Sequence, residues 1–592
     1  MKKLIGVLCS VLAGGLFAAD GTWIVTSGTL NYTDTANWKD GVVAGDGGTM
    51  TVTNTAATTV NLDGSVTLGK IVGVVNNFFY FNSGTWVMTE PATICNNSVY
   101  AEGNTLQFQG TSTIQTAGDL TLTGVARIVL MNANDIGGRF VVSGPEARAR
   151  AKTEACLGPT PTDYVADAVV LDGGTLENAD GNTWLTFSAN RGIYVTENNG
   201  YLGASCSGSG GVRVQSKITG PGSFGVNGQN LSVYIANPGN DYRGDTIVGS
   251  TGPGFAGGDA KFRTEADEVI PHGEGFGVLQ LGPDSTYLRS ANYTSPNKTV
   301  RNMVSHSRLY LQNHTETVNA VEGGARGHLH GGTLILGSNA DSHFNGVLES
   351  DATLVKRGTG TLWMPGGHTY GKLVLEEGTL ALAPYYLHAN AILEAKGGRL
   401  VLAGPTGGWV ESAASAYGYP NFLQTFYSGN WTYNAKWYIP ETKNYSFARS
   451  LKGTCSLTID DVEILSGTAA DNALTVVRDV QMTEGWHTVR ITANLGNALS
   501  TLLPAGLMYD AGNGAFSTDE EIFRAREFSD DNGPNVRADG GVFRTDGKIV
   551  VSGPVTVSKD EFLSKAIFGG LLTTDPENPQ TMTVDLPEGE LL

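Results

Sequence analysis

The sequence has few charged residues, few cysteines and no long apolar run after its N-terminus, and each shortage excludes a class of protein. Only 16% of the 592 residues are charged and 40% are hydrophobic, which is too apolar for a disordered chain. Aspartate and glutamate (57) outnumber lysine and arginine (38), and the net charge of −19 opposes binding to nucleic acid or to anionic membrane surfaces. No later run approaches 18 apolar residues, so we expect no transmembrane helix in the mature chain.

The five cysteines are too few and too widely spaced to hold a disulfide framework. Cys9 lies in the N-terminal apolar segment. Among the other four, Cys156 and Cys206 are closest in sequence and are the pair best placed for a single bridge; buried free thiols are the alternative. No CxxC pair occurs, so we predict no zinc site made of cysteines.

The N-terminus is typical of an export signal. Two lysines precede an apolar run over 4–17, which is too short to span a bilayer, and two small alanines follow it. We therefore predict that residues 1–19 are a signal peptide and that the protein is secreted or lies on a bacterial cell surface.

Glycine, by contrast, is abundant at 80 residues, and it recurs in a phrase that continues with threonine and then leucine or tryptophan. Copies of the phrase begin at Gly28, Gly84, Gly174, Gly332, Gly360 and Gly378, with a variant at Gly398. In the last four copies the second residue recurs at intervals of 28, 18 and 20, which indicates stacked supersecondary units. The alternating apolar residues of LVLEEGTLAL (373–382) predict two short strands separated by a turn.

We therefore predict an all-β protein in which residues 20–404 form a right-handed parallel β-solenoid, or β-helix, used as a stalk. A series of antiparallel β-sandwiches is the competing interpretation, because sandwiches also have short strands and frequent turns. The solenoid is favoured because the same phrase recurs each time.

One stretch resembles a known repeat. LVKRGTGTLWMPGGHTYG (354–371), followed by the phrase at Gly378, is similar to the autotransporter-associated β-strand repeat of large secreted bacterial proteins. This resemblance implies a β-solenoid passenger of that type. The C-terminus contains no series of alternating strands of about ten residues, so we do not expect self-secretion through a barrel of its own.

Between Trp409 and Phe447 the glycine phrase stops and aromatic residues become frequent, which marks a domain boundary. WYIPETKNYSF (437–447) predicts a strand, a turn and a strand, and Asp460-Asp461 between alternating residues predicts a two-residue hairpin.

This order resembles the protective-antigen-type β-sandwich module, which is related to the GLEYA adhesin domains. The resemblance implies carbohydrate binding, in some members through calcium held by paired aspartates. The stretch 451–456, where the family has its acidic pair, contains no carboxylate, so calcium is not supported and we expect no cofactor. The candidate ligand-binding residues are Trp431, Tyr433 and Trp437, whose rings could stack on a sugar; the alternative is that they fill the core of the module.

Other polar residues give no catalytic or metal site. His328 and His330 are two residues apart and would share one face of a strand, but the sequence places no third ligand beside them, so we predict no metal site. We interpret His487 as a packing or surface residue, and the oxygen-rich turns at 178–182 and 530–533 as turns rather than calcium sites. The acidic residues are scattered and no nucleophile or phosphate-binding motif occurs, so we name no catalytic residue.

The sequence thus predicts four regions: the signal peptide 1–19, a β-solenoid over 20–404, a protective-antigen-type β-sandwich over 405–545, and a C-terminal β segment over 546–592, for which further solenoid is an open alternative. The predicted function is that of an exported, non-enzymatic surface or matrix protein that binds glycans or mediates adhesion through the sandwich. Its partner would be an extracellular polysaccharide or a cell-surface glycan. A purely structural extracellular scaffold is the first alternative, and a polysaccharide-active β-helix enzyme is the second.

Overall fold

In the residues that it describes, the computed structural model consists of β-strands and three short 3-10 helices, η1 (Thr35–Asn37), η2 (Lys39–Gly41) and η3 (Glu154–Leu157). The all-β prediction is confirmed for the residues that the structure describes. None of these residues belongs to a helix long and apolar enough to cross a bilayer. The described residues are 18–99, 103–204, 210–228, 232–249, 260–266, 268–281, 286–289, 293–294, 299–301, 307–321, 327–337, 339–344, 346–364, 368–382, 387–404, 409–412, 415–420, 429–450, 453–469, 475–495, 506–510, 536–568, 572–574 and 582–585.

The chain divides into two compact units. The first contains residues up to Pro271 together with Gly275–Gly277, and the second contains His272–Glu274 and the residues from Val278 onward.

In the first unit the strands form parallel sheets, in which each strand pairs with strands about 20 to 30 residues away along the chain. The first sheet has the order β1 (Gly21–Trp23), β3 (Gly48–Asn54), β5 (Ser65–Val75), β7 (Thr85–Asn96), β10 (Leu120–Gly124), β13 (Phe140–Ser143), β15 (Val165–Asp172), β18 (Arg191–Val195) and β21 (Ile218–Thr219), with β9 (Thr113–Thr116) paired to β7 and β12 (Asp135–Ile136) paired to β9. The second sheet has the order β2 (Gly28–Asn31), β4 (Thr58–Asn61), β6 (Phe79–Phe81), β8 (Thr105–Phe108), β11 (Arg127–Leu130), β14 (Arg148–Ala151), β16 (Thr175–Asn178), β19 (Gly200–Ala204), β22 (Phe224–Gly228) and β24 (Thr246–Val248). The third sheet contains, within this unit, β17 (Trp184–Phe187), β20 (Gly211–Val214), β23 (Ser232–Ile235) and β25 (Lys261–Thr264).

Apolar side chains of the first sheet form a continuous inward column. Val142 of β13 is the register partner of Leu122 on one side and of Leu171 on the other, and Leu171 pairs with Val195. All four are at most 1% exposed. Each such side chain contributes about 1.5–3 kcal/mol by leaving water, so the column holds neighbouring strands in register.

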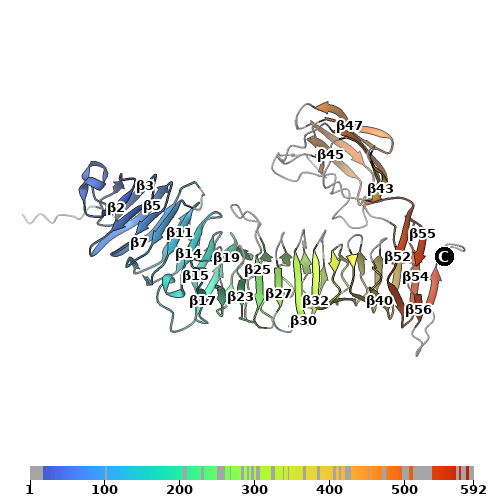
Figure 1. Cartoon of the computed structure of the whole chain (residues 1–592), viewed down its shortest axis with the longest axis horizontal. Helices are drawn as coiled ribbons and strands as arrows, with labels where there is room; N and C mark the ends of the chain where they lie inside the picture. The colour runs from blue at the N-terminus through green and yellow to red at the C-terminus, as the bar shows by residue number, and fades with distance from the viewer. Residues whose placement is uncertain are drawn as a thin grey trace, which may run out of the picture. The chain divides into compact units, whose positions relative to one another are not determined.

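In the second unit parallel strands again pair in sequence, and Figure 1 shows β27, β30, β32 and β40 in order along this unit. One sheet has the order β27 (Thr286–Arg289), β30 (Arg308–Val318), β32 (His328–Leu336), β35 (Ala352–Lys356), β38 (Lys372–Leu375), β40 (Ile392–Ala395), β53 (Lys548–Val551) and β56 (Leu572–Thr574), with β28 (Tyr293–Thr294) on β30, β34 (Val347–Leu348) on β32 and β37 (His368–Thr369) on β34. A second sheet has the order β33 (Ser342–His343), β36 (Thr361–Met364), β39 (Thr379–Leu382), β41 (Arg399–Leu402), β54 (Val555–Lys559) and β57 (Met582–Asp585). Shorter parallel groups are β26 (Leu279–Leu281), β29 (Thr299–Arg301) and β31 (Ala320–Val321), and the pair β52 (Gly541–Thr545) and β55 (Leu563–Phe568).

The glycine-threonine-leucine phrase marks the start of strands in several sheets. β36, β39 and β41 follow its last copies and pair in register, so Leu362, Leu380 and Leu400 lie side by side in the core. β2 and β16 begin with the phrase in the second sheet of the first unit, and β7 begins with it in the first sheet. The phrase therefore indicates a turn followed by a strand, and not one particular face.

Two antiparallel sheets interrupt the parallel pairing of the second unit. One has the order β43 (Ser415–Pro420), β42 (Trp409–Ser412), β44 (Gly429–Ile439), β49 (Gly485–Leu495), β46 (Gly453–Ile459) and β47 (Val462–Ala469), with β51 (Val536–Arg537) on β44; the other has the order β48 (Thr475–Met482), β45 (Lys443–Ser450) and β50 (Gly506–Asp510). After them the parallel pairing resumes, since Ala395 of β40 pairs with Val551 of β53, and Leu400 of β41 pairs with Val557 of β54.

The predicted hairpin at Asp460-Asp461 is confirmed. Ile459 pairs with Val462 across the turn, and both aspartates have positive φ values of 48° and 63°. Positive φ at both central residues is the requirement of a type I′ turn, which aspartate tolerates better than most residues.

Of the two alternatives for the cysteines, a single bridge or buried thiols, the structure shows buried thiols at the described positions. Cys156 is a buried free thiol, as are Cys95 and Cys455, while Cys206 lies outside the described residues. The alternative of buried thiols therefore holds for these three.

Candidate functional site

Two of the three predicted sugar-binding rings lie in the core of the antiparallel module. Tyr433 is 1% exposed and Trp437 is 5% exposed, because alternate residues of β44 point inward. The ring of Trp437 packs against Tyr445 and Phe447 of β45, at centroid distances of 5.5 and 6.4 Å. Tyr433 and Trp437 therefore fill the core of the module, which is the alternative given for them, and do not face a ligand. The side chain of Trp431 lies outside the described residues.

His487 ties a hairpin rather than reaching into a site. Its Nδ1 lies 2.6 Å from Asp460 Oδ2, and its Nε2 lies 2.8 Å from the carbonyl oxygen of Thr483. With both ring nitrogens engaged, the ring fixes the β46–β47 turn against the start of β49, which agrees with a structural role.

The oxygen-rich turn at 178–182 is held by its own side chains. Asn178 accepts from the backbone N–H of Asp180 and donates to the carbonyl oxygen of Thr183, and Asp180 accepts from the N–H of Asn182. These are Asx-turn contacts, so the turn interpretation accounts for this sequence. The turn predicted at 530–533 lies outside the described residues.

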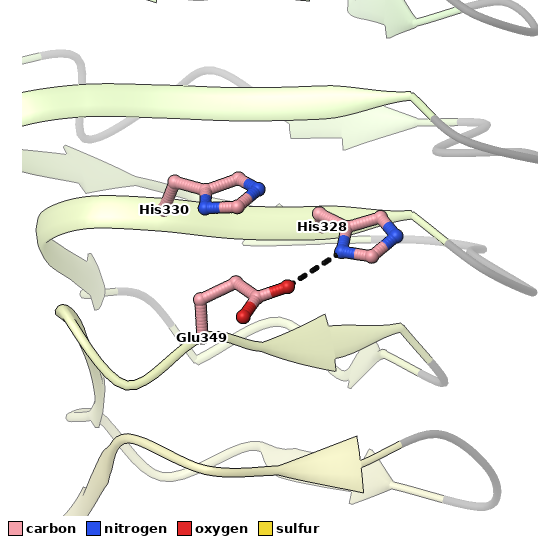
Figure 2. A group of neighbouring side chains, drawn as sticks. All are labelled: His328, His330 and Glu349. Atoms are coloured by element: carbon pink, nitrogen blue, oxygen red, sulfur yellow. Dashed lines mark hydrogen bonds and ion pairs between the residues drawn. The ribbon is translucent and has the colours of Figure 1, made fainter.

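Three potential metal ligands meet on one side of β32 (Figure 2). His328 and His330 are two residues apart on this strand and project to the same side, as their spacing predicts. The third residue is Glu349, which directly follows β34. Its backbone N–H donates to the carbonyl oxygen of Leu329 at 3.1 Å, so the pairing of β34 with β32 continues to Glu349 and sets it beside His330.

The three side chains are close and partly accessible. His328 Nδ1 lies 2.8 Å from Glu349 Oε1, and the ligand atoms of all three residues lie within 4.8 Å of one another. The two imidazoles stack with centroids 5.6 Å apart. The side chains of His328 and Glu349 are 26% and 28% exposed, so solvent reaches the cluster. Within the described part of the chain, no other histidine, cysteine, aspartate or glutamate residues form such a group of three.

The surroundings of His330 favour its neutral form. Burial lowers the pKa of His330, the charges of Glu349 and Asp351 act in the opposite direction, and the charge of Arg308 adds to the lowering; the net shift is downward. A neutral imidazole keeps a free lone pair on one nitrogen, which is the form that coordinates metals.

A second histidine pair lies one strand further along the same sheet. His368 of β37 is the register partner of Val347 in β34, and His368 Nδ1 lies 3.1 Å from His388 Nε2. Tyr370 stacks on His388 with a centroid distance of 4.1 Å. Burial and then the neighbouring His388 lower the pKa of His368. Unlike the cluster on β32, this pair belongs to no group of three ligands in the described residues.

The first unit carries an outward row of aromatic and arginine side chains that the sequence interpretation missed. The ring of Trp184 covers Gly211, where a Cβ would lie 3.0 Å from the indole, and it contacts Tyr234 at 5.2 Å. The guanidinium of Arg213 lies 5.1 Å from the Trp184 ring and 5.5 Å from the Tyr234 ring, and Arg263 lies 5.2 Å from Tyr234. Trp184 is 37% exposed. The residues of this row come from four parallel strands and lie far apart in the sequence.

Comparisons of the chain with protein-family models, with curated proteins and with solved structures returned no match.

Proposed function

We propose that the chain is an exported, non-enzymatic surface or matrix protein, in which a right-handed parallel β-solenoid acts as a stalk for an inserted antiparallel β-sandwich. The observation that carries the proposal is that parallel pairing resumes beyond the antiparallel module. Leu400 pairs with Leu380 on one side and, on the other, with Val557, which follows the module in the sequence. A stalk interrupted by a module in this way suits display of that module. The resemblances to the autotransporter-associated repeat and to the protective-antigen-type module support the same function.

The physical logic of a stalk agrees with what the described residues do. Parallel strands that pair with the next copy along the chain contact only their neighbours, and their inward leucines are used for packing. Right-handed crossovers are the rule for parallel strands of one sheet. The leucines of the recurring glycine-threonine-leucine phrase are thereby explained by stability, without a catalytic group.

The architecture is tested by a cysteine pair across the insertion. Arg399 and Thr556 are register partners, and neighbouring parallel strands bring Cα atoms about 5 Å apart, inside the range of about 4.4–6.8 Å that a disulfide needs. Oxidation of the full chain carrying Arg399→Cys and Thr556→Cys should give an intramolecular bridge in high yield. Arg399→Cys with Lys559→Cys is the matched control, because Lys559 is the partner of Leu402 instead. Equal bridging in both pairs would contradict the proposed register.

Export is tested by expressing the full chain with its own N-terminus in a Gram-negative host. The proposal expects a periplasmic product whose first residue is Asp20, as read by N-terminal sequencing. A folded product that stays in the cytosol and retains Met1 would overturn it.

Glycan binding is the second function, and the outward row on the first unit favours it. Aromatic faces stack on sugar rings, and the guanidinium group of Arg263 would attract carboxylate or sulfate groups of an acidic polysaccharide. The guanidinium of Arg213 is partly neutralised by Glu265, whose Oε1 lies 2.8 Å from it. The side chain of Trp184 is partly open to solvent. By contrast, Tyr433 and Trp437, the two described candidate rings of the antiparallel module, are buried.

Substitutions in the full chain distinguish glycan binding by the outward row from glycan binding by the antiparallel module. If the row binds, Trp184→Ala should abolish signals on an array of acidic and neutral glycans, while Trp431→Ala leaves them unchanged. Tyr80→Ala is a matched control, because Tyr80 stacks on Phe78 in the same unit. Loss of binding with Trp431→Ala alone would return the function to the sandwich, and absence of any signal would leave the purely structural scaffold.

A further inference from the structure

We propose that His328, His330 and Glu349 form a binding site for one divalent transition-metal ion, with zinc as the ion that the ligand set suits best. Two imidazole nitrogens and one carboxylate are a ligand set that zinc accepts, and soft thiolates or a large shell of oxygens are not needed. This site is independent of glycan binding, because it lies in the second unit and uses none of the residues of the outward row on the first unit.

The ligand atoms of the three side chains already lie nearly as close to one another as they would around a bound zinc ion. Zinc bonds of about 2.0–2.2 Å at tetrahedral angles place ligand atoms about 3.3 Å apart. His328 and Glu349 are already closer than this, at 2.8 Å, because they share a hydrogen bond. The largest separation allowed within the group, 4.8 Å, would close by about 1.5 Å, which a rotation of one side chain provides.

The backbone fixes the ligands on neighbouring strands. His328 and His330 are held by the pairing of β32 with β30 on one side and with β34 on the other. Immediately after His330 the chain turns at Gly331, whose φ of +57° lies in the left-handed region. The register thus holds the two histidines and Glu349 together before any ion binds, which lowers the ordering cost of binding.

The electrostatic surroundings are suited to a cation. Glu349 supplies one negative charge, and a second carboxylate is near, since Asp351 Oδ2 lies 3.5 Å from the position that a Cβ would take at Gly331, directly after His330. Arg308 opposes the cation, but its side chain is exposed and its charge is screened by solvent. With three protein ligands and partial exposure, one coordination position stays open to water or to a group of another molecule.

The test uses the full chain without a polyhistidine tag, stripped of metal with a chelator and dialysed. Titration with Co²⁺, followed by the visible absorption of the four-coordinate ion and by displacement with Zn²⁺, should give one ion per chain. Glu349→Gln preserves the size of the side chain and a hydrogen bond to His328, but should weaken the affinity by at least about 100-fold, because removal even of an outer-shell partner costs 10- to 100-fold. His328→Gln should have a similar effect.

His388→Gln is the matched control, since His388 belongs to the neighbouring histidine pair on the same sheet. It should leave both stoichiometry and affinity unchanged. Circular dichroism and the melting temperature without metal verify that each variant is folded, and added Zn²⁺ should raise the melting temperature of the wild-type chain more than that of Glu349→Gln. The proposal is overturned if the wild-type chain binds no stoichiometric ion, if Glu349→Gln binds as tightly as the wild type, or if His388→Gln loses the ion.

Discussion

At the scale of single residues, the side chain of Arg537 is a buried cation. It is only 4% exposed, and it contacts the carboxylate of Asp560 and donates to the carbonyl oxygen of Gly404 at 3.0 Å. Its guanidinium lies 4.9 Å from the ring of Trp363 and 4.4 Å from that of Phe562. Burial lowers the pKa of Arg537, and the charge of Asp560 opposes this shift. The pair is therefore stable only while both charges are present.

We predict that Arg537→Met lowers the free energy of unfolding by about 3 kcal/mol, because it leaves the half-buried carboxylate of Asp560 without its cation. Urea denaturation of the full chain measures the change. The double variant with Asp560→Asn should recover part of the loss, since both charges are then gone. If the double variant loses more free energy of unfolding than the two single variants lose together, this explanation is wrong.

The ion pair between Asp119 and Arg139, which is more exposed, makes the stability of the folded chain depend on pH. Three hydrogen bonds from Arg139 to Asp119, at 2.6–2.8 Å, lower the pKa of the Asp119 carboxyl below its usual value. A lowered pKa in the folded state means that the contribution is present above the ordinary value near 3.9 and is lost as the pH falls through the folded value. Both side chains are at least one-third exposed, so we expect Asp119→Asn to cost at most about 0.5 kcal/mol at pH 7. The difference from the wild type, measured by thermal unfolding, should shrink as the pH falls below the ordinary value of about 3.9; a difference that grows in acid would have the wrong sign.

The residue scale also shows what could be read from the sequence at the candidate metal site. The shared direction of His328 and His330 follows from their spacing. Glu349 was missed, although it lies 21 residues after His328, within the range of the 18- to 28-residue repeat. A search one repeat beyond each histidine would have found it as a candidate, but only the register shows that it sits beside His330 and not one residue away, where its side chain would point inward.

At the scale of strands and turns, buried asparagines connect strands of the first unit to later segments that are not strands. Asn134 accepts from the backbone N–H of Ile114 at 2.8 Å and donates to the carbonyl oxygen of Cys156 at 2.7 Å. Asn240 makes the same kind of bridge between Ile218 and Val269. The N–H groups belong to β9 and β21, whereas the carbonyl groups lie outside strands, that of Cys156 in η3 and that of Val269 after β25, and each amide satisfies one donor and one acceptor at once.

We predict that Asn134→Ala lowers the free energy of unfolding by about 2–4 kcal/mol, because it leaves one buried N–H and one buried carbonyl unpaired. Asn132→Ala is the matched control, since Asn132 is only half-buried and makes a single bond to the carbonyl oxygen of Ser112. It should cost about 1 kcal/mol or less. Equal losses in the two variants, measured by urea denaturation, would mean that the bridge has no special role.

The strands themselves were predictable where local rules decide. Turn chemistry located the hairpin at Asp460-Asp461, and alternation of leucine located the strands around Leu373 and Leu380. Which face of β44 is buried could not be predicted, because Tyr433 and Trp437 alternate equally well whether their side of the strand is the core or the surface. The choice depends on which side the second antiparallel sheet covers, and its Tyr445 and Phe447 come from another strand.

At the scale of the whole molecule, the antiparallel module behaves as an insertion into a continuous parallel pattern. The change of composition at Trp409 marked its beginning in the sequence. Its end was harder to place, because 536–545 contains both β51, which pairs with the module, and β52, which pairs in parallel with β55. The boundary thus falls within a few residues that serve both parts of the second unit.

This arrangement predicts that the module can be removed. Deletion of 409–535 retains Arg537 with its contacts to Gly404 and Asp560, and it leaves the partners of β40 and β41 intact. We expect the shortened chain to remain folded, with a β-type circular dichroism spectrum and a melting temperature within a few degrees of the full chain, because the parallel strands bury their leucines without the module. Deletion of 409–547 is the matched control: it also removes Arg537 and β52, so β55 loses its partner and Asp560 its cation, and the melting temperature should fall clearly. If the shorter deletion gives an unfolded or aggregated chain, or if the two deletions melt alike, the parallel strands depend on the module and the description of it as an insertion on a self-sufficient stalk is wrong.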